Sequence, residues 1–151
     1  MSTDSLNIRL AERADRDALF GLMHELGYRS LSQSEFDEVF NEVLSRGDTW
    51  VLVAEEAGRV LGLASMSERP QLRLGGPIVT IDEFVVRSDV RGKGVGRLLL
   101  ESAKEYARQR GGRRLQLDTN RSRESYSRSF YLKNGFAEAD SAVLRLELTK
   151  K

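Results

Sequence analysis

Apolar residues recur along this chain with two different spacings, which separate helices from strands. A first stripe with steps of three and four residues predicts a helix that ends at Gly27. Its members are Leu19, Leu22, Met23 and Leu26. Ser32 and Glu35 have the spacing of a capping box, which predicts the start of a second helix that ends near residues 47–48.

Alternating or β-rich runs predict strands in six places. They cover residues 6–10, 50–55, 60–66, 78–86, 115–119 and 142–148. The second and third are separated by Glu56-Ala57-Gly58-Arg59, a turn sequence, so we expect a hairpin there. The polar residues 67–77, which include the breaker Gly75-Gly76-Pro77, are expected to form a loop.

Two further helices are expected in the second half, from about Gly94 to Gly111-Gly112 and over residues 122–133, ending at Asn134-Gly135. The buried face of the first should consist of Val95, Leu98, Leu99, Ala103, Tyr106 and Ala107. The element order is then βααβββαβαβ, with one more short strand considered around Phe136. Such an order predicts an α/β fold whose sheet is parallel in its second half and antiparallel in its first.

Composition narrows the class of protein without naming it. A chain of 151 residues fits one domain, residues 1–151. Its formal net charge is +1, so there is no overall field that would draw in nucleic acid or a membrane surface. A local basic set is read as a solvated face, and no nucleic-acid partner is expected. That set is Arg108, Arg110, Arg113, Arg114, Arg121, Arg123 and Arg128.

The chain has no cysteine, which excludes disulfides, thiolate zinc sites and a cysteine nucleophile. We expect no metal ion. Its first residues are polar, and no stretch approaches the ~20 apolar residues that a membrane helix needs. The expectation is a cytoplasmic protein with no membrane partner.

The segment Arg91-Gly92-Lys93-Gly94-Val95-Gly96 lies between the strongest predicted strand and a helix start. Glycines there allow the backbone to approach a ligand, and the first turn of a helix offers N–H groups to an anion. Arg91, Lys93 and Arg97 add positive charge. Together these features predict a pyrophosphate site, with a plain strand-to-helix turn as the alternative.

The spacing of the glycines excludes two common phosphate loops. A Rossmann fingerprint needs glycines at offsets zero, two and five, and the offset of five falls on Arg97 or Leu99. A P-loop needs Gly-Lys-Ser/Thr after four intervening residues, and this chain has none.

Instead, residues 91–96 resemble the Arg/Gln-x-x-Gly-x-Gly/Ala motif of the GCN5-related N-acetyltransferases, the GNAT superfamily. Residues 81–86 before the loop resemble the central strand of that family. Residues 130–136, Phe-Tyr-Leu-Lys-Asn-Gly-Phe, resemble its second signature, Phe-Tyr-x-x-x-Gly-Phe. Asp118-Thr119-Asn120 before this signature is similar to the branch of aminoalkylphosphonate and aminoglycoside 6′ acetyltransferases, although Arg128-Ser129 replaces the Ala-His pair usual there.

The resemblance implies a mixed, centrally splayed β-sheet flanked by about four helices. It implies acetyl-CoA as cosubstrate, bound by the glycine loop and by backbone groups of the splayed strand. The residues implied in binding are Phe84, Val85, Val86, Arg91, Gly92, Lys93, Gly94, Val95, Gly96, Arg97 and Asn120. For Asn120, a helix N-cap is an equal alternative.

The resemblance also implies catalytic roles. Tyr131 would be the general acid for the departing thiolate, and the Val86 N–H would donate to the carbonyl oxygen. Asp82 and Glu83 are candidate bases for the acceptor amine, with Glu83 placed ahead. Because adjacent strand residues point to opposite faces, only one of the two should face the amine unless a β-bulge re-aims the other.

We therefore expect an enzyme that transfers acetyl directly to a primary amine of a small molecule. The first two helices and residues 67–77 should line the acceptor cleft, with Glu25, Tyr28, Arg29 and Arg73 as candidates. A protein N-terminal or lysine acetyltransferase and a non-catalytic acetyl-CoA-binding module are alternatives. Many members of the family are dimers, so a homodimer is a further expectation.

Overall fold

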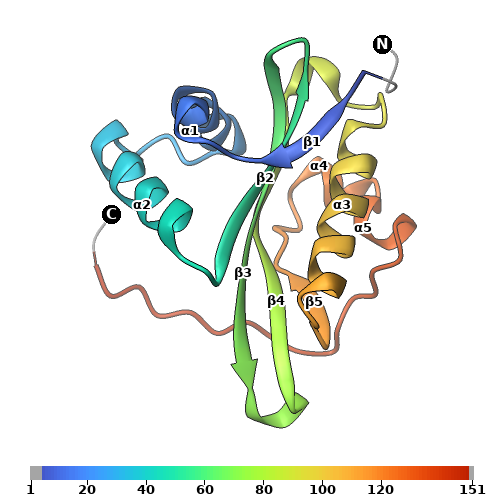
Figure 1. The fold of residues 1–151 in the computed structure, drawn as a ribbon. Helices are drawn as coiled ribbons and strands as arrows, with labels where there is room; N and C mark the ends of the chain where they lie inside the picture. Colours follow the sequence, from blue (N-terminus) through green and yellow to red (C-terminus); the bar gives the residue numbers. More distant parts are fainter. Residues whose placement is uncertain (1–4, 150–151) are drawn as a thin grey trace. The chain divides into compact units, whose positions relative to one another are not determined.

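The computed structural model describes residues 5–149 and divides them into two compact units (Figure 1). The first ends at Leu117 and the second begins at Asp118. No helix within residues 5–149 has both the length and the apolar character needed to cross a bilayer.

The first unit is built on a five-stranded sheet whose strands follow one another in chain order. The strands are β1 (Asn7–Leu10), β2 (Thr49–Glu56), β3 (Arg59–Gln71), β4 (Gly76–Val86) and β5 (Arg114–Leu117). The first three pairings are antiparallel, and the β4–β5 pairing is parallel. The mixed sheet expected from the element order is confirmed.

Helices α1 (Arg16–Leu26) and α2 (Gln33–Ser45) cover one face of the sheet (Figure 1). The predicted stripe of α1 is buried with residues of the strands in one core. Gly27 ends α1 with φ 119°, and Ser32 and Glu35 form the predicted capping box of α2. The members of this core are Leu19, Leu22, Met23, Phe40, Val51, Val53, Val60, Leu63 and Val85.

Helix α3 (Val95–Gln109) packs on the opposite face, where Tyr106 lies 5.8 Å from the ring of Trp50. The predicted buried face is correct for Val95, Leu99, Ala103 and Ala107, while Leu98 and Tyr106 keep partial exposure. Leu100 is buried in addition.

The expectation of a solvated basic face is wrong for Arg110, which is only partly exposed. Its guanidinium carbon lies 4.4 Å from the Trp50 ring centroid, and its Nη2 donates to Glu68 Oε1 and to the carbonyl oxygen of Gly47. The face of the Trp50 ring attracts the guanidinium through a cation–π contact, and the Glu68 carboxylate balances its charge.

The expectation of a loop over residues 67–77 is wrong. Strand β3 runs to Gln71 and β4 starts at Gly76, joined by a 3₁₀ turn, Leu72–Leu74. Polar side chains therefore mark an exposed end of a long hairpin, because ladder hydrogen bonds hold a strand irrespective of its polarity. The β2–β3 turn is as expected, with φ 51° at Ala57 and 78° at Gly58.

The second unit contains α4 (Glu124–Ser127) and α5 (Phe130–Lys133). A single helix over residues 122–133 was expected, but Ser129 adopts φ 58° and separates two short helices. The predicted strands at residues 142–148 and around Phe136 are also wrong, since residues 136–148 form neither helix nor strand. Residues 5–149 thus contain five α-helices, against about four expected.

Candidate functional site

The centre of the candidate site is a β-bulge in β4. Ser65 of β3 lies opposite Glu83, while the next residue, Met66, lies opposite Ile81. Asp82 is therefore an extra residue with no counterpart on β3. Bulges bend a strand and re-aim side chains, and they are common beside active sites. The condition under which both carboxylates could face the amine is met.

Hydrogen bonds show where the bulge directs the two carboxylates. The Ser65 hydroxyl donates to Glu83 Oε1 at 2.9 Å and accepts the Glu83 backbone N–H at 3.0 Å. Asp82 is hydrogen-bonded to Ser67. Ser65 and Ser67 are two residues apart on one strand and so share a face of the sheet. Asp82 and Glu83 therefore both lie on that face.

This face is the one that α1 and α2 cover. Leu63 and Val85 belong to the core formed with those helices. Leu63 lies two residues before Ser65 on β3, and Val85 lies two residues after Glu83 on β4. Residues two apart on a strand point the same way. The carboxylates thus lie on the side of the sheet where the sequence places the acceptor cleft.

Both carboxylates are harder to ionise than usual. Burial raises the pKa of Glu83, the Ser65 hydrogen bond opposes that rise, and the nearby negative charge of Asp82 adds to it. Asp82 is exposed at the surface, so the protein removes only part of its water. This partial desolvation is still enough to raise the pKa of Asp82. The hydrogen bond from Ser67 and the charge of Arg69 act in the opposite direction. A carboxylate with a raised pKa is a stronger base.

Next to the bulge, β4 and β5 separate. Their parallel pairing runs from Ile78–Arg114 to Ile81–Leu117 and stops, whereas β4 continues to Val86. The Arg87 N–H donates to the Leu61 carbonyl at 2.8 Å, so by alternation the N–H and C=O of Val86 point to the edge that β5 has left. The splayed sheet expected from the resemblance is confirmed.

The glycine loop leads from this edge into α3. Gly92 has φ 79° and Gly94, the N-cap of α3, has φ 87°, conformations that glycine adopts readily. The Leu98 N–H bonds to the Gly94 carbonyl at 3.2 Å, which leaves the N–H groups of residues 95–97 directed out of the helix end. Those groups and the helix dipole suit a pyrophosphate.

The loop residues differ in what they can offer a ligand. The Val95 side chain is buried in the core, so only its backbone N–H faces the helix end. Gly96 lies inside the first turn of α3, and Lys93 and Arg97 are exposed. The loop therefore presents peptide groups flanked by two solvent-facing cations.

Arg91 is held on the protein itself. Its Nε donates to the Val86 carbonyl at 3.0 Å, and its Nη2 lies 3.7 Å from Glu25 Oε1 of α1. The same carboxylate oxygen accepts the Ser88 N–H. Glu25 was a candidate from the sequence for lining the cleft of the acceptor amine. In the structure it joins α1 to the loop. Arg91 thus contacts both the end of β4 and the Glu25 carboxylate of α1.

Tyr131 lies in α5 of the second unit, between Phe130 and Phe136. The ring centroids are 5.1 Å and 5.9 Å from that of Tyr131, both edge-on. Burial raises the pKa of Tyr131 to about 12, against the opposing charge of Arg123. The phenol therefore keeps its proton at neutral pH, as a general acid must.

Asn120 does not cap a helix. Its Oδ1 accepts the Ser122 N–H at 2.9 Å and the Ser122 hydroxyl at 2.7 Å, which closes a side-chain turn. The N-cap of α4 is Arg123. The N-cap alternative is wrong, and the role of Asn120 toward the cofactor stays a prediction.

The sequence interpretation missed Ser65 and Ser67 as partners of the carboxylates. Two serines at alternate positions in an apolar strand were a usable signal, but the bulge that brings Asp82 and Glu83 to them has no pattern of its own. The His24 Nε2–H donates to the Leu31 carbonyl oxygen at 3.1 Å, and the imidazole ring packs on Phe20. Within residues 5–149, no group of three or more His, Asp or Glu side chains is placed to hold a metal.

Comparison with known proteins agrees with this geometry. The sequence matches the Acetyltransferase (GNAT) family over residues 16–136. An aminoalkylphosphonate N-acetyltransferase of Salmonella typhimurium is 32% identical over 132 residues, 87% of this chain and 85% of that protein. A probable glucosamine 6-phosphate N-acetyltransferase of Oryza sativa subsp. japonica is 32% identical over 142 residues, 89% of this chain and 83% of that protein.

Solved structures share the fold. An aminoglycoside N-acetyltransferase in complex with CoA has a TM-score of 0.82 at 20% identity, with 95% of each chain covered. The Salmonella relative confirms the expected resemblance to the branch that includes aminoalkylphosphonate acetyltransferases, and the solved structure shows the shared fold.

Proposed function

Because the chain belongs to the acetyltransferase (GNAT) family and is an N-acetyltransferase, we propose that it transfers acetyl from acetyl-CoA directly to a primary amine of a small molecule. The observation that carries this proposal is the adjacency of three features along β4 and directly after it. The carboxylate bulge, the edge that β5 leaves and the glycine loop follow one another within residues 82–96.

The residues present fit acetyl-CoA, which supplies an activated thioester. An extended arm that carries amide groups can bond to the peptide groups of β4 that β5 leaves unpaired beyond Ile81. The first-turn N–H groups of α3 suit the pyrophosphate, with Lys93 and Arg97 beside them. The proposed binding residues are Phe84, Val85, Val86, Arg91, Gly92, Lys93, Gly94, Val95, Gly96, Arg97 and Asn120.

Glu83 is proposed as the base. A free alkylamine is mostly protonated at neutral pH, since such amines titrate near ~10.4, and it must lose a proton before it can attack. Glu83 is partly buried, its pKa is raised, and Ser65 fixes its orientation. Asp82 is exposed, so we assign it to holding the positive charge of the incoming amine.

Tyr131 is proposed as the acid, with its partly buried phenol giving a proton to the departing sulfur. The Val86 N–H, which points to the edge of β4, is proposed to donate to the carbonyl oxygen as it gains negative charge. With no cysteine in the chain, acyl transfer without a covalent enzyme intermediate is the simplest course. Initial-rate lines that intersect would support a ternary complex, and parallel lines would contradict it.

We further propose an acceptor that carries an anionic phosphonate or phosphate beside its amine. The names of two relatives, for aminoalkylphosphonate and for glucosamine 6-phosphate, share that chemistry. Here Arg69 follows Ser65 and Ser67 along the same face of β3, and its charge acts on Asp82. On this face, the cation can bind the phosphonate or phosphate of such a substrate, and the two carboxylates can bind its amine.

The proposal is tested by thiol release from acetyl-CoA with a panel of acceptors. The panel contains aminoalkylphosphonates, amino sugar phosphates, aminoglycosides, polyamines, amino acids and peptides with free N-termini or lysines. We expect turnover with small amines, highest for those bearing a phosphonate or phosphate. Turnover of peptides alone would identify a protein acetyltransferase. Tight acetyl-CoA binding with no turnover across the panel would favour a binding module.

A further inference from the structure

Two arginines lie on either side of β4 at one level of the sheet. Arg69 of β3 and Arg114 of β5 are each the register partner of Ile78. Neighbouring strands are about 4.8 Å apart, so the backbones of the two arginines are separated by roughly 10 Å. An extended arginine side chain can cover half of that distance. Because Ile78 itself is buried, a ligand at this level would meet the two guanidinium groups.

Both arginines lie on the face of the sheet that carries the two carboxylates of the bulge. Arg69 shares that face with Ser65 and Ser67, because it follows them at alternate positions of β3. Side chains of residues in register on adjacent strands lie on the same face of a sheet. Ile78 therefore points as Arg69 does, and Arg114 points as Ile78 does.

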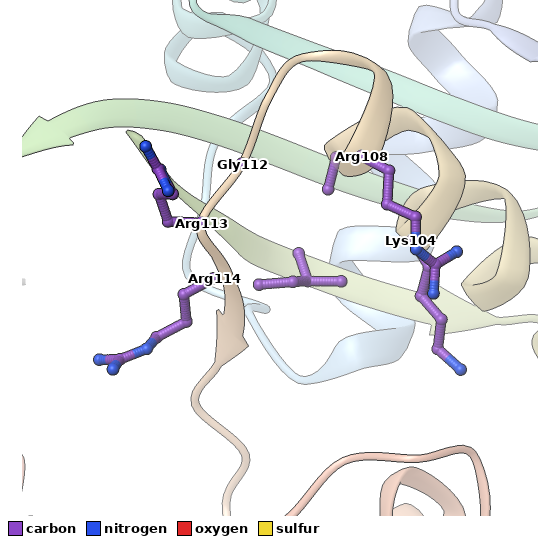
Figure 2. Close-up of a pocket in the computed structure, with 7 residues that line it drawn as sticks. Lys104, Arg108, Gly112, Arg113 and Arg114 are labelled. Carbon is purple, nitrogen blue, oxygen red and sulfur yellow. The ribbon is translucent and has the colours of Figure 1, made fainter. Parts of the chain in front are cut away.

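Figure 2 shows the surroundings of Arg114. A cleft of about 180 Å³ lies between the end of α3 and the start of β5, with Leu115 in its lining. Lys104 and Arg108 project from α3 on that side, whereas Arg113 and Arg114 extend away from them. The Arg114 residue borders the cleft, but its guanidinium is directed away from α3, as the strand register requires.

Neither guanidinium is neutralised by a carboxylate of the protein. Within residues 5–149, no salt bridge involves Arg69 or Arg114, whereas Arg110 is paired with Glu68. Both side chains are exposed. Two cations on either side of one strand repel each other, and an anion between them would replace that repulsion by two attractions. The pair is therefore suited to a ligand with more than one negative charge.

A row of neutral polar side chains separates the two cations from the carboxylates. Ser67, Thr80 and Gln116 are in register across β3, β4 and β5, and all three are partly buried. Ser65 and Arg69 are four residues apart on β3, which corresponds to roughly 13 Å at ~3.3 Å per residue. Side chains that reach in from both ends shorten this span to the length of a small acceptor.

We propose that Arg114 and Arg69 together bind the phosphonate or phosphate of the acceptor, and that Arg114 determines selectivity for a dianion over a carboxylate. A guanidinium pairs with a phosphoryl group through two hydrogen bonds, and such a group has three free oxygens and close to two negative charges at neutral pH. A carboxylate has two oxygens and one charge, so it satisfies one arginine and leaves the other. This inference rests on the proposed acetyl transfer to an anion-bearing amine.

Kinetics with matched acceptors test the selectivity. Aminoethylphosphonate, β-alanine and propylamine share an aminoethyl chain and end in a dianion, a monoanion and a methyl group. Arg114→Ala should raise KM for the phosphonate about tenfold or more. It should change KM for the other two within about threefold and kcat for all three within about twofold. An equal rise in KM for the phosphonate and for β-alanine would overturn the proposal.

The matched control is Arg113→Ala. Arg113 is also exposed and extends to the same side as Arg114, but it precedes β5 and is not in register with Ile78. This variant should leave every KM within about twofold. Since both arginines are exposed, neither variant should lower the melting temperature. Equal effects of the two variants on KM for the phosphonate would reject Arg114 as the selective residue.

Binding measured without catalysis separates this inference from the proposed function. A phosphorus NMR titration of aminoethylphosphonate, with CoA present instead of acetyl-CoA, gives the dissociation constant of the phosphonate. That constant should rise about tenfold in Arg114→Ala and stay within about twofold in Arg113→Ala. Equal binding by both variants, with amines still acetylated, would remove the arginine pair and keep the enzyme. Binding that depends on Arg114, with no amine acetylated, would keep the pair and remove the acetyl transfer.

Discussion

The Ser65 hydroxyl and the Glu83 carboxylate form a reciprocal pair across two strands. Ser65 donates to Glu83 Oε1 at 2.9 Å and accepts the Glu83 N–H at 3.0 Å. The first bond stabilises the ionised carboxylate, and the second holds the backbone where the bulge displaces it. One hydroxyl thus both opposes the rise in the pKa of the proposed base and holds its position.

Replacement of Ser65 by alanine should move the pH profile. Burial raises the pKa of Glu83 and the Ser65 hydrogen bond opposes that rise, so its loss should raise the pKa further. A base is active only when unprotonated, and the acidic limb of kcat/KM should therefore shift to higher pH. Ser65→Thr keeps the hydroxyl and serves as the control. An unmoved limb in Ser65→Ala would separate Ser65 from the base.

Glu83→Gln should lower kcat by about 10²–10⁴-fold near neutral pH, the range typical of a lost general base. Affinity for acetyl-CoA, measured by calorimetry, should be unchanged. Asp82→Asn is the paired variant. Because Asp82 is assigned to charge rather than to proton transfer, it should raise KM for the amine and leave kcat within about tenfold. A larger loss of kcat in Asp82→Asn than in Glu83→Gln would reverse the two roles.

Tyr131→Phe should reduce kcat by about 10²-fold or more while acetyl-CoA still binds. In the parent enzyme, the pKa of about 12 means that Tyr131 stays protonated across the working range, so no alkaline decline below pH ~11 should be due to it. Tyr126→Phe is the control, since that hydroxyl bonds to Glu138 Oε2 at 3.2 Å. Equal rates for Tyr131→Phe and the parent protein would remove Tyr131 from the acid role.

Gly94→Ala should weaken acetyl-CoA binding. The φ of 87° at Gly94 costs about 1 kcal/mol with a side chain, and the strain falls on the turn that aims the first N–H groups of α3. Gly111→Ala places the same strain, at φ 75°, beyond the other end of α3. Calorimetry should show reduced affinity for the first variant only. Similar losses in both would indicate general destabilisation rather than a pyrophosphate site.

Arg69→Ala should raise KM for an aminoalkylphosphonate and spare the matching amine without the phosphonate. The reason is that Arg69 supplies a cation on the face that carries Asp82. Arg73, whose Nη1 donates to Gln71 Oε1 at 2.7 Å, was the candidate from the sequence and provides the comparison. A selective rise in KM for Arg73→Ala would assign the anion to the tip of the hairpin instead.

Elements with strong local signals could be predicted from the sequence. The stripe of α1, the capping box at Ser32 and the turn at Ala57-Gly58 each specify their structure within a few residues. The glycine loop belongs to the same class, because left-handed φ values at Gly92 and Gly94 need glycine.

Features that depend on distant partners could not be predicted. The bulge at Asp82 arises from the register between β3 and β4, which no single segment encodes. Arg110 left its expected solvated face because Trp50 and Glu68, remote in sequence, receive it. Residues 142–148 alternate apolar and polar side chains as a strand does, but they form no strand. A strand needs a second strand to pair with as well as the alternating pattern.

The departure of β5 from β4 at Ile81 has a consequence for how the enzyme can change over time. Beyond that point the proposed recognition of the cofactor runs through peptide groups, which are the same in every amino acid except proline. The Val85 side chain serves the core under α1 and α2, and it can be replaced by another apolar residue without touching that recognition. Substitutions in the core can therefore accumulate without changing how the acetyl donor is bound. The residues that face the acceptor amine can vary independently of them.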